Sequence, residues 1–215
     1  MAKRTLADKL ESFRLLIFNS GDVQVAPILE AMGIDADYLS NGVSLYNETV
    51  ELVDQQKKEY QDQSLAYDNF YLEKDEADLN LNRTLKLVRV LTRRDEDLQD
   101  RLKLGTLKPN AIEEWIEKTV DFYNRLLNEA GLLANLARFN VTVDQLEDEK
   151  DQISDLRTLR NNAISEKGQA QEATRLRNEM LDELTDYCME LKAVAEIALE
   201  SQPQLLEKLG VLVRS

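Results

Sequence analysis

Carboxylates are the side chains that occur in this sequence in groups dense enough for chemistry. Two carboxylates held close together can act as general acid and base, or can bind a hard cation such as Mg²⁺ or Ca²⁺. The densest runs are Glu73, Asp75 and Glu76; Asp95, Glu96 and Asp97; and Glu147, Asp148 and Glu149. Because adjacent residues of a helix point about 100° apart, we expect each run to spread around its helix and stay solvated rather than converge on a site.

Some acids are instead spaced to form ion pairs along a helix surface. An acid four residues before a base faces that base across one helical turn, and such a pair stabilises a helix by a few tenths of a kcal/mol. The pairs that fit this spacing are Asp54 with Lys58, Asp97 with Arg101, and Asp121 with Arg125.

Most other catalytic and metal-binding chemistry is missing. The sequence has no histidine, which excludes Ser-His-Asp triads, Cys-His pairs and every His-containing zinc or di-iron site. Its single cysteine, Cys188, excludes thiolate cages and two-thiol redox chemistry within one subunit. Neither glycine-rich phosphate motif occurs. We therefore predict no catalytic, cofactor-binding or metal-ligating residue and no cofactor. A carboxylate enzyme or a hard-cation binder is the alternative.

Cys188 and the clustered aromatic residues fit packing better than reactivity. Cys188 lies in an apolar helical pattern between Tyr187 and Met189, which favours a small buried hydrophobic side chain over a reactive thiol. Four aromatic residues also follow one another at helical steps, so we expect contact with a core or a partner rather than a ligand site. They are Tyr60, Tyr67, Phe70 and Tyr71.

The charge argues against two classes of partner. A formal net charge of -14 repels polyanions, so we predict no nucleic-acid binding. The same charge opposes anionic lipid surfaces, and no uncharged run is long enough to span a bilayer. The first residues, up to Phe18, form an amphipathic pattern rather than a secretory signal, so we expect a cytoplasmic protein.

The elements that must position these side chains are helices. Residues 43–104 contain neither Gly nor Pro, and apolar positions recur at alternating three- and four-residue steps through them. That spacing is typical of a coiled coil or long bundle helix. We therefore predict an all-α fold, an elongated helical bundle with two long coiled-coil-like helices and several short helices, as one domain over residues 1–215.

Helix signals divide the second part of the chain. Gly105 and Pro109 predict a stop, and Asn110 with Glu113 predicts a capped restart near Ala111. The helix that follows carries two apolar stripes, so we expect it to be central and covered on more than one side. Thr142 with Gln145 resembles a second capping box. The helix after it should reach about Leu199, before Pro203.

The two parts of the chain correspond when the first residue is aligned with residue 108. This shift places Ile34 on Val141, Asp37 on Asp144, Leu39 on Leu146, Leu52 on Leu159, Ala66 on Ala173, Leu98 on Leu205 and Leu102 on Leu209. Either a tandem duplication, with pseudo-repeats 1–107 and 108–215, or a shared heptad phase explains this correspondence.

Two stretches are too polar to pack well. Residues 54–64 offer only Tyr60 to a core, and residues 160–172 are similarly polar. A solvated shaft, a kink and a partner-binding surface all fit this pattern.

Several landmarks resemble an uncharacterised family of all-helical bacterial proteins of about this length. They are Leu104-Gly105 with Pro109; Trp115; Phe122-Tyr123; the segment from Thr142 to Leu146; the segment from Gly168 to Arg175; and the segment from Ala198 to Gly210. The resemblance implies a bacterial helical bundle. It implies no activity and no site residue, because the family has none assigned.

We predict from these patterns a noncatalytic protein-protein interaction or scaffold protein. Long heptad stretches leave apolar surface that pairs with a second copy, giving a homo-oligomer, or with a partner helix. Two alternatives stay open. One is a membrane-active bundle that inserts residues 6–18 or 126–139, and the other is the carboxylate-based cation binder.

Overall fold

The computed structural model describes residues 5–107 and 111–211, and within them the chain is helical without any strand. The chain divides into two compact units. Unit 1 comprises Met1–Glu59 and Ala170–Ser215, and unit 2 comprises Tyr60–Gln169. Two long helices and several short ones make up both units, which confirms the predicted fold class.

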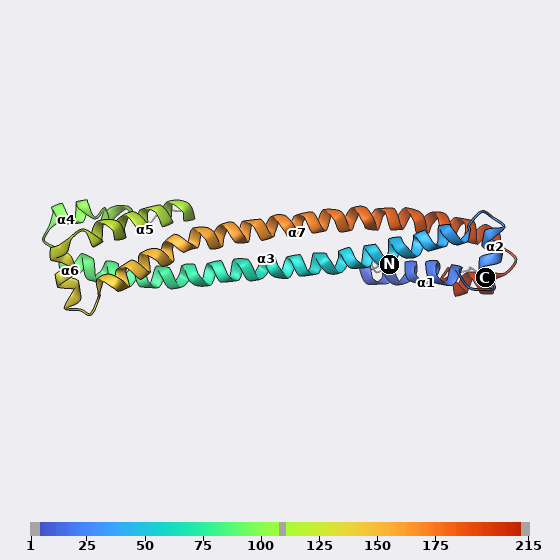
Figure 1. Cartoon of the computed structure of the whole chain (residues 1–215), viewed down its shortest axis with the longest axis horizontal. Helices are drawn as coiled ribbons and strands as arrows, with labels where there is room; N and C mark the ends of the chain where they lie inside the picture. Colours follow the sequence, from blue (N-terminus) through green and yellow to red (C-terminus); the bar gives the residue numbers. More distant parts are fainter. Residues whose placement is uncertain (1–4, 108–110, 212–215) are drawn as a thin grey trace. The chain divides into compact units, whose positions relative to one another are not determined.

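Unit 1 combines the two ends of the chain (Figure 1). It contains α1 (Leu6–Ser20), α2 (Ala26–Glu30), the first part of α3 (Ala36–Leu91), the last part of α7 (Val143–Ala198) and α8 (Pro203–Lys208). Thr5 and Asp8 form a capping box at the start of α1. The core joins α1 and α2 to the end of α7 and to α8, through side chains such as Leu16, Leu29, Leu191 and Leu206.

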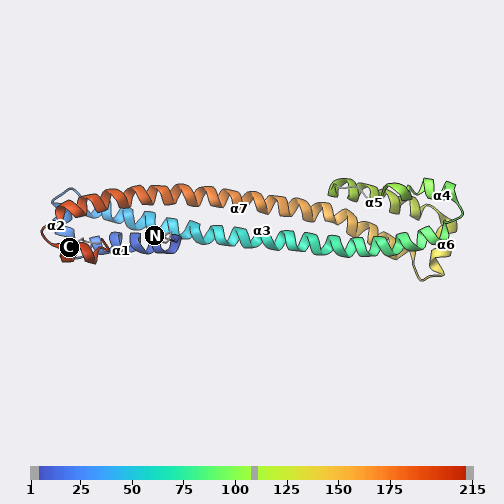
Figure 2. The same cartoon turned by 180° about the vertical axis from the view of Figure 1, so that it is seen from behind.

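Unit 2 is built from the middle of the chain (Figure 2). It contains the last part of α3, α4 (Glu96–Arg101), a short 3₁₀ turn (Leu104–Thr106), α5 (Ile112–Leu127), α6 (Ala130–Ala137) and the first part of α7. Its core joins α3 and α7 to α5 and α6, through side chains such as Phe70, Phe122, Leu136 and Leu146.

The long helices run antiparallel within each unit. In unit 1, the Tyr187 hydroxyl donates to the Tyr38 carbonyl (2.9 Å), and Gln56 donates to Thr174 (3.3 Å). In unit 2, Asn80 donates to Gln152 (3.3 Å). The α7 partner moves back along the sequence as the α3 residue moves forward, so the two helices point in opposite directions.

Two predictions about the helices need correction. The first long helix ends at Leu91 rather than near residue 104, because Asp95 caps a separate helix, α4, by accepting a hydrogen bond from the Leu98 amide (2.9 Å). The helix from Ile112 to Leu127 is not covered on two sides. Its buried side chains form one broad face, which leaves Ile112, Val120 and Leu127 only half-buried.

The predicted caps have different outcomes. The Thr142 hydroxyl accepts a hydrogen bond from the Gln145 amide (3.1 Å) at the start of α7. Asn110 lies outside the described residues, and Ala111 occupies the N-cap position of α5 without a side-chain cap. Gly168 lies inside α7 without ending it, and Pro203 is the first residue of α8.

The helix bounds recur with the offset that relates the two predicted pseudo-repeats. This offset carries both ends of α3 onto the ends of α7, and both ends of α4 onto the ends of α8. The left-handed backbone positions recur as well. The same offset carries Gly33 (φ 91°) to Asn140 (φ 61°) and Lys103 (φ 52°) to Gly210 (φ 76°).

Two ion pairs occupy positions related by the same offset, and in each pair the acid and the base come from different halves of the chain. In unit 1, Lys208 from α8 contacts Asp22 before α2 (2.7 Å), and in unit 2 Arg101 from α4 contacts Glu129 before α6 (3.0 Å). Each unit therefore takes its first helices from one half of the chain and its last helices from the other.

Candidate functional site

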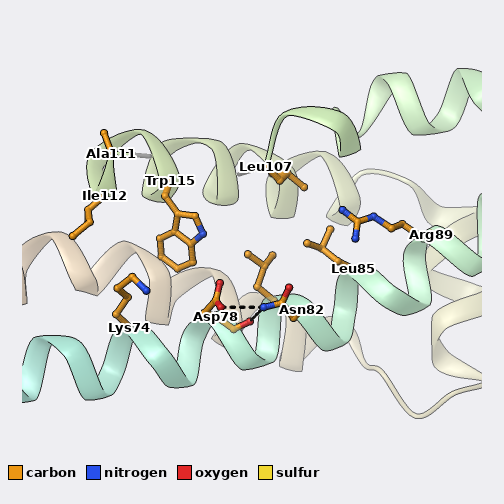
Figure 3. A pocket seen from close by; sticks show the side chains of 10 residues that line it. Lys74, Asp78, Asn82, Leu85, Arg89, Leu107, Ala111, Ile112 and Trp115 are labelled. Atoms are coloured by element: carbon orange, nitrogen blue, oxygen red, sulfur yellow. Dashed lines mark hydrogen bonds between the residues drawn. The ribbon is translucent and has the colours of Figure 1, made fainter. Parts of the chain in front are cut away.

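A cleft of about 340 Å³ lies between α3 and α5 in unit 2. Lys74, Asp78, Asn82 and Arg89 line it from α3, and Trp115 lines it from α5. Figure 3 shows the Trp115 ring pointing from α5 toward α3, with Lys74 reaching up beside it. The Lys74 ammonium lies 5.5 Å from the centre of that ring, a distance typical of a cation-π contact.

The polar groups of this cleft largely engage one another. The Asn82 amide donates to the carboxylate of Asp78 (3.0 Å) and to its carbonyl (2.7 Å), as Figure 3 shows. A catalytic nucleophile is activated by an adjacent base, by a lowered pKa or by a metal ion. The lining side chains combine one acid, two cations and an amide with apolar groups, so they offer a binding surface rather than a nucleophile-base pair.

A buried carboxylate lies in the core of unit 2. Glu149 from α7 is 6% exposed and accepts hydrogen bonds from Thr84 of α3 (2.9 Å), Tyr123 of α5 (2.8 Å) and Gln145 (2.8 Å). Burial, together with the neighbouring Glu149 carboxylate, raises the pKa of the Tyr123 phenol well above its usual range. The phenol therefore stays a donor, and these contacts join the three helices.

The acidic runs behave differently from the sequence prediction at this one position. Glu147 and Asp148 are exposed as predicted, but Glu149 shares the face of α7 that carries Leu146 and Ile153 into the core. Its carboxylate oxygens accept hydrogen bonds from three protein side chains, as a buried polar group requires. Among the residues that the structure describes, no three acidic or cysteine side chains gather closely enough to hold a metal ion.

Only one of the predicted ion pairs forms as proposed. Arg125 contacts Asp121 (2.9 Å), and Lys103 contacts the same carboxylate (3.2 Å). Together these cations lower the pKa of Asp121, with the Arg125 hydrogen bond as the largest cause. The other two pairs are replaced. Asp54 contacts Lys57 (2.8 Å). Arg101, predicted to pair with Asp97, contacts Glu129 instead.

The cysteine is buried as predicted, and the four clustered aromatic residues divide between core and surface. Cys188 is buried in unit 1, and burial raises its pKa to about 12. Phe70 is buried in unit 2 and Tyr67 is half-buried, whereas Tyr60 and Tyr71 are exposed. The prediction that Tyr60 supplies the polar stretch with a core contact is therefore wrong.

The segments considered for membrane insertion contribute to the cores. Residues 6–18 bury Leu16 and Ile17, and residues 126–139 bury Leu126, Leu132 and Leu136. Across residues 5–107 and 111–211, none of the helices combines the length and the apolar character needed to cross a bilayer.

Comparison with known proteins adds no assignment. No protein-family model, curated protein or solved structure matches the chain. The resemblance to an uncharacterised bacterial family stays a prediction.

The side of α3 opposite the unit 2 core carries a row of exposed leucines. Leu65, Leu72 and Leu79 are 65%, 67% and 71% exposed and follow one another at seven-residue steps. Their spacing places them about 10 Å apart along one side of the helix. The buried side chains of the same segment, such as Phe70, Ala77 and Leu81, lie on the opposite side of α3. We call the three exposed leucines the leucine row.

Proposed function

We propose that this protein is a noncatalytic interaction protein that binds a helix, from a second copy or from a partner protein, through the leucine row. The observation that carries this proposal is the seven-residue spacing of Leu65, Leu72 and Leu79 in the exposed part of α3. Single exposed leucines are common, but leucines at seven-residue steps stay on one side of their helix, where one approaching helix buries them together.

The energetics favour association through this row. Each leucine that passes from this exposure to a helix-helix seam contributes about 1 kcal/mol or more. Three such residues, supported by neighbouring contacts, are enough to make binding depend on the row. A cytoplasmic setting remains a prediction from the sequence, and the net charge of -14 supports the exclusion of nucleic acid.

The test removes the apolar side chains and leaves the fold in place. In the variant L65Q/L72Q/L79Q, the three changed positions are exposed, so helical content and melting temperature should stay close to those of the unchanged protein. Binding to the partner or second copy should weaken by about a hundredfold or more, since about 3 kcal/mol is lost. Sedimentation velocity measures self-association, and capture from lysate followed by titration of the purified partner measures binding to another protein.

The control replaces other exposed apolar residues of the chain. Ile164, Met189 and Ile197 lie on α7 with 48%, 65% and 65% exposure. The variant I164Q/M189Q/I197Q should bind as the unchanged protein does. Equal binding by the leucine-row variant and the unchanged protein would contradict the proposed function, and so would equal loss in both variants.

A further inference from the structure

Charged residues continue the leucine row in an ordered way. Asp68, Asp75 and Glu76 are exposed beside the leucines, and Arg83 and Lys86 follow on the same side of α3. Arg93 is exposed in the turn directly after α3. Val90, 71% exposed, lies eighteen residues after Leu72, which is about five turns, so both point in the same direction. We call the set formed by the leucine row, Val90 and these six charged residues the outer face of α3.

The outer face is divided by charge. Its acids lie between residues 68 and 76, and its bases lie between residues 83 and 93. The division falls close to residue 80. A second helix with the same face, packed antiparallel about this point, places its bases opposite the acids and its acids opposite the bases.

We propose that a second copy of this chain binds the outer face antiparallel, about a two-fold axis close to residue 80 of α3. In this register Asp68 lies near the second copy's Arg93, Asp75 near its Lys86, and Glu76 near its Arg83. Leu72 meets Val90, and the two Leu79 side chains meet near the axis. Each pair lies within two residues of perfect register, about 3 Å along the helix. This inference rests on the proposed function and names its partner.

Other arrangements of two copies bring like charges together. A parallel pair aligns the acids with acids and the bases with bases. An antiparallel pair centred on Leu72 places Asp68 against Asp75 and Glu76. Like charges opposed in this way are destabilising and select against a register. The register close to residue 80 satisfies all three pairs in both directions, as an isologous two-fold interface requires.

The net charge of -14 on each copy does not prevent this contact. At physiological ionic strength the Debye length is about 8 Å, so charges far from the interface repel each other weakly. Opposite charges in direct contact are screened less. The local pattern of the outer face therefore outweighs the overall charge.

Charge reversal on the full-length chain tests the register. The variants R83E/K86E/R93E and D68K/D75K/E76K each give one half of the outer face the charge of the other half. By sedimentation equilibrium we expect a dimer of about twice 24.7 kDa for the unchanged chain and the monomer mass for each triple variant. Carrying all six changes in one chain should restore the dimer, and mixing the two triple variants should give a heterodimer.

The control R138E/K167E/K192E changes the net charge as much as R83E/K86E/R93E does, at exposed cations of α7 and of the turn after α6, and should stay dimeric. Circular dichroism of each variant shows that the helices are intact. A monomeric unchanged chain would overturn the inference, and so would a dimer that both triple reversals leave intact. Neither result decides the proposed function, which is tested separately by whether L65Q/L72Q/L79Q weakens binding to any partner.

Discussion

Gly42 lets the two long helices of unit 1 approach closely. A Cβ added there would overlap the ring and the hydroxyl of Tyr187, which stacks on Tyr38 at 4.7 Å. We expect G42A to lower the free energy of unfolding by about 1 to 2 kcal/mol, because overpacking of about 1 to 3 kcal/mol exceeds the helix propensity that alanine gains. Urea denaturation followed by circular dichroism measures the change.

Gly168 provides the matched comparison inside α7. A Cβ added at Gly168 meets nothing within 4 Å. The variant G168A should therefore raise the free energy of unfolding by up to about 1 kcal/mol. If both variants stabilise the protein, Tyr187 does not pack closely against Gly42.

Cys188 should be chemically silent in the folded protein. Burial raises its pKa from 9.0 to about 12, so the thiolate needed for reaction is scarce and enclosed. At about pH 8 a thiol reagent should react far more slowly with the native protein than with the urea-unfolded chain.

Because the folded state holds the Cys188 proton more tightly than the unfolded state, this thiol stabilises the fold fully below pH 9.0 and loses its contribution as pH rises toward 12. A native reaction as fast as the unfolded one would contradict the burial.

The burial of some single residues can be predicted from the sequence, whereas the burial of others cannot. The burial of Cys188 follows from its apolar neighbours, but Glu149 looks like its solvated neighbours Glu147 and Asp148. Its burial depends on donors that come from two other helices, Thr84 and Tyr123. The outer face is equally hard to find in the sequence, because the leucine row does not indicate which side of its helix faces the core. That side is decided by the helices packed against α3.

Among the helices, local signals predict most of the structure. The absence of Gly and Pro from residues 43–104 predicts most of α3, and the Thr142 cap marks the start of α7. The end of α3 cannot be predicted in this way, because residues 92–94 contain nothing that must break a helix and the Asp95 cap resembles part of an acidic run. The placement of α5 is equally ambiguous in the sequence, because two apolar stripes can merge into one broad buried face.

Across the complete chain, the two units share helix bounds and turns at equivalent positions but differ in their side chains. The repeat offset carries Gly42 to Glu149, so the position that admits the Tyr187 ring in unit 1 holds the buried carboxylate in unit 2. A shared heptad phase explains apolar matches in long helices. It does not explain why turns, left-handed residues and ion pairs recur at the same offset. These features favour a tandem duplication. Exchanging the order of the two halves in a circular permutant tests this interpretation.

A circular permutant that starts at residue 108, runs to residue 215 and continues with residues 1–107 should fold like the original. Residues 212–215 and 1–4 would then link Val211 to Thr5, and residues 105–111 already link the equivalent positions, Leu104 and Ile112, in unit 2. Each unit needs helices from both halves but not a particular order of halves, so we expect unchanged helical content and a melting temperature within a few degrees. A second permutant, opened between Glu59 and Tyr60, interrupts α3 and should melt at a clearly lower temperature. If the permutant opened at residue 108 melts as low as this control or lower, the halves are not interchangeable and the repeat reflects heptad phase alone.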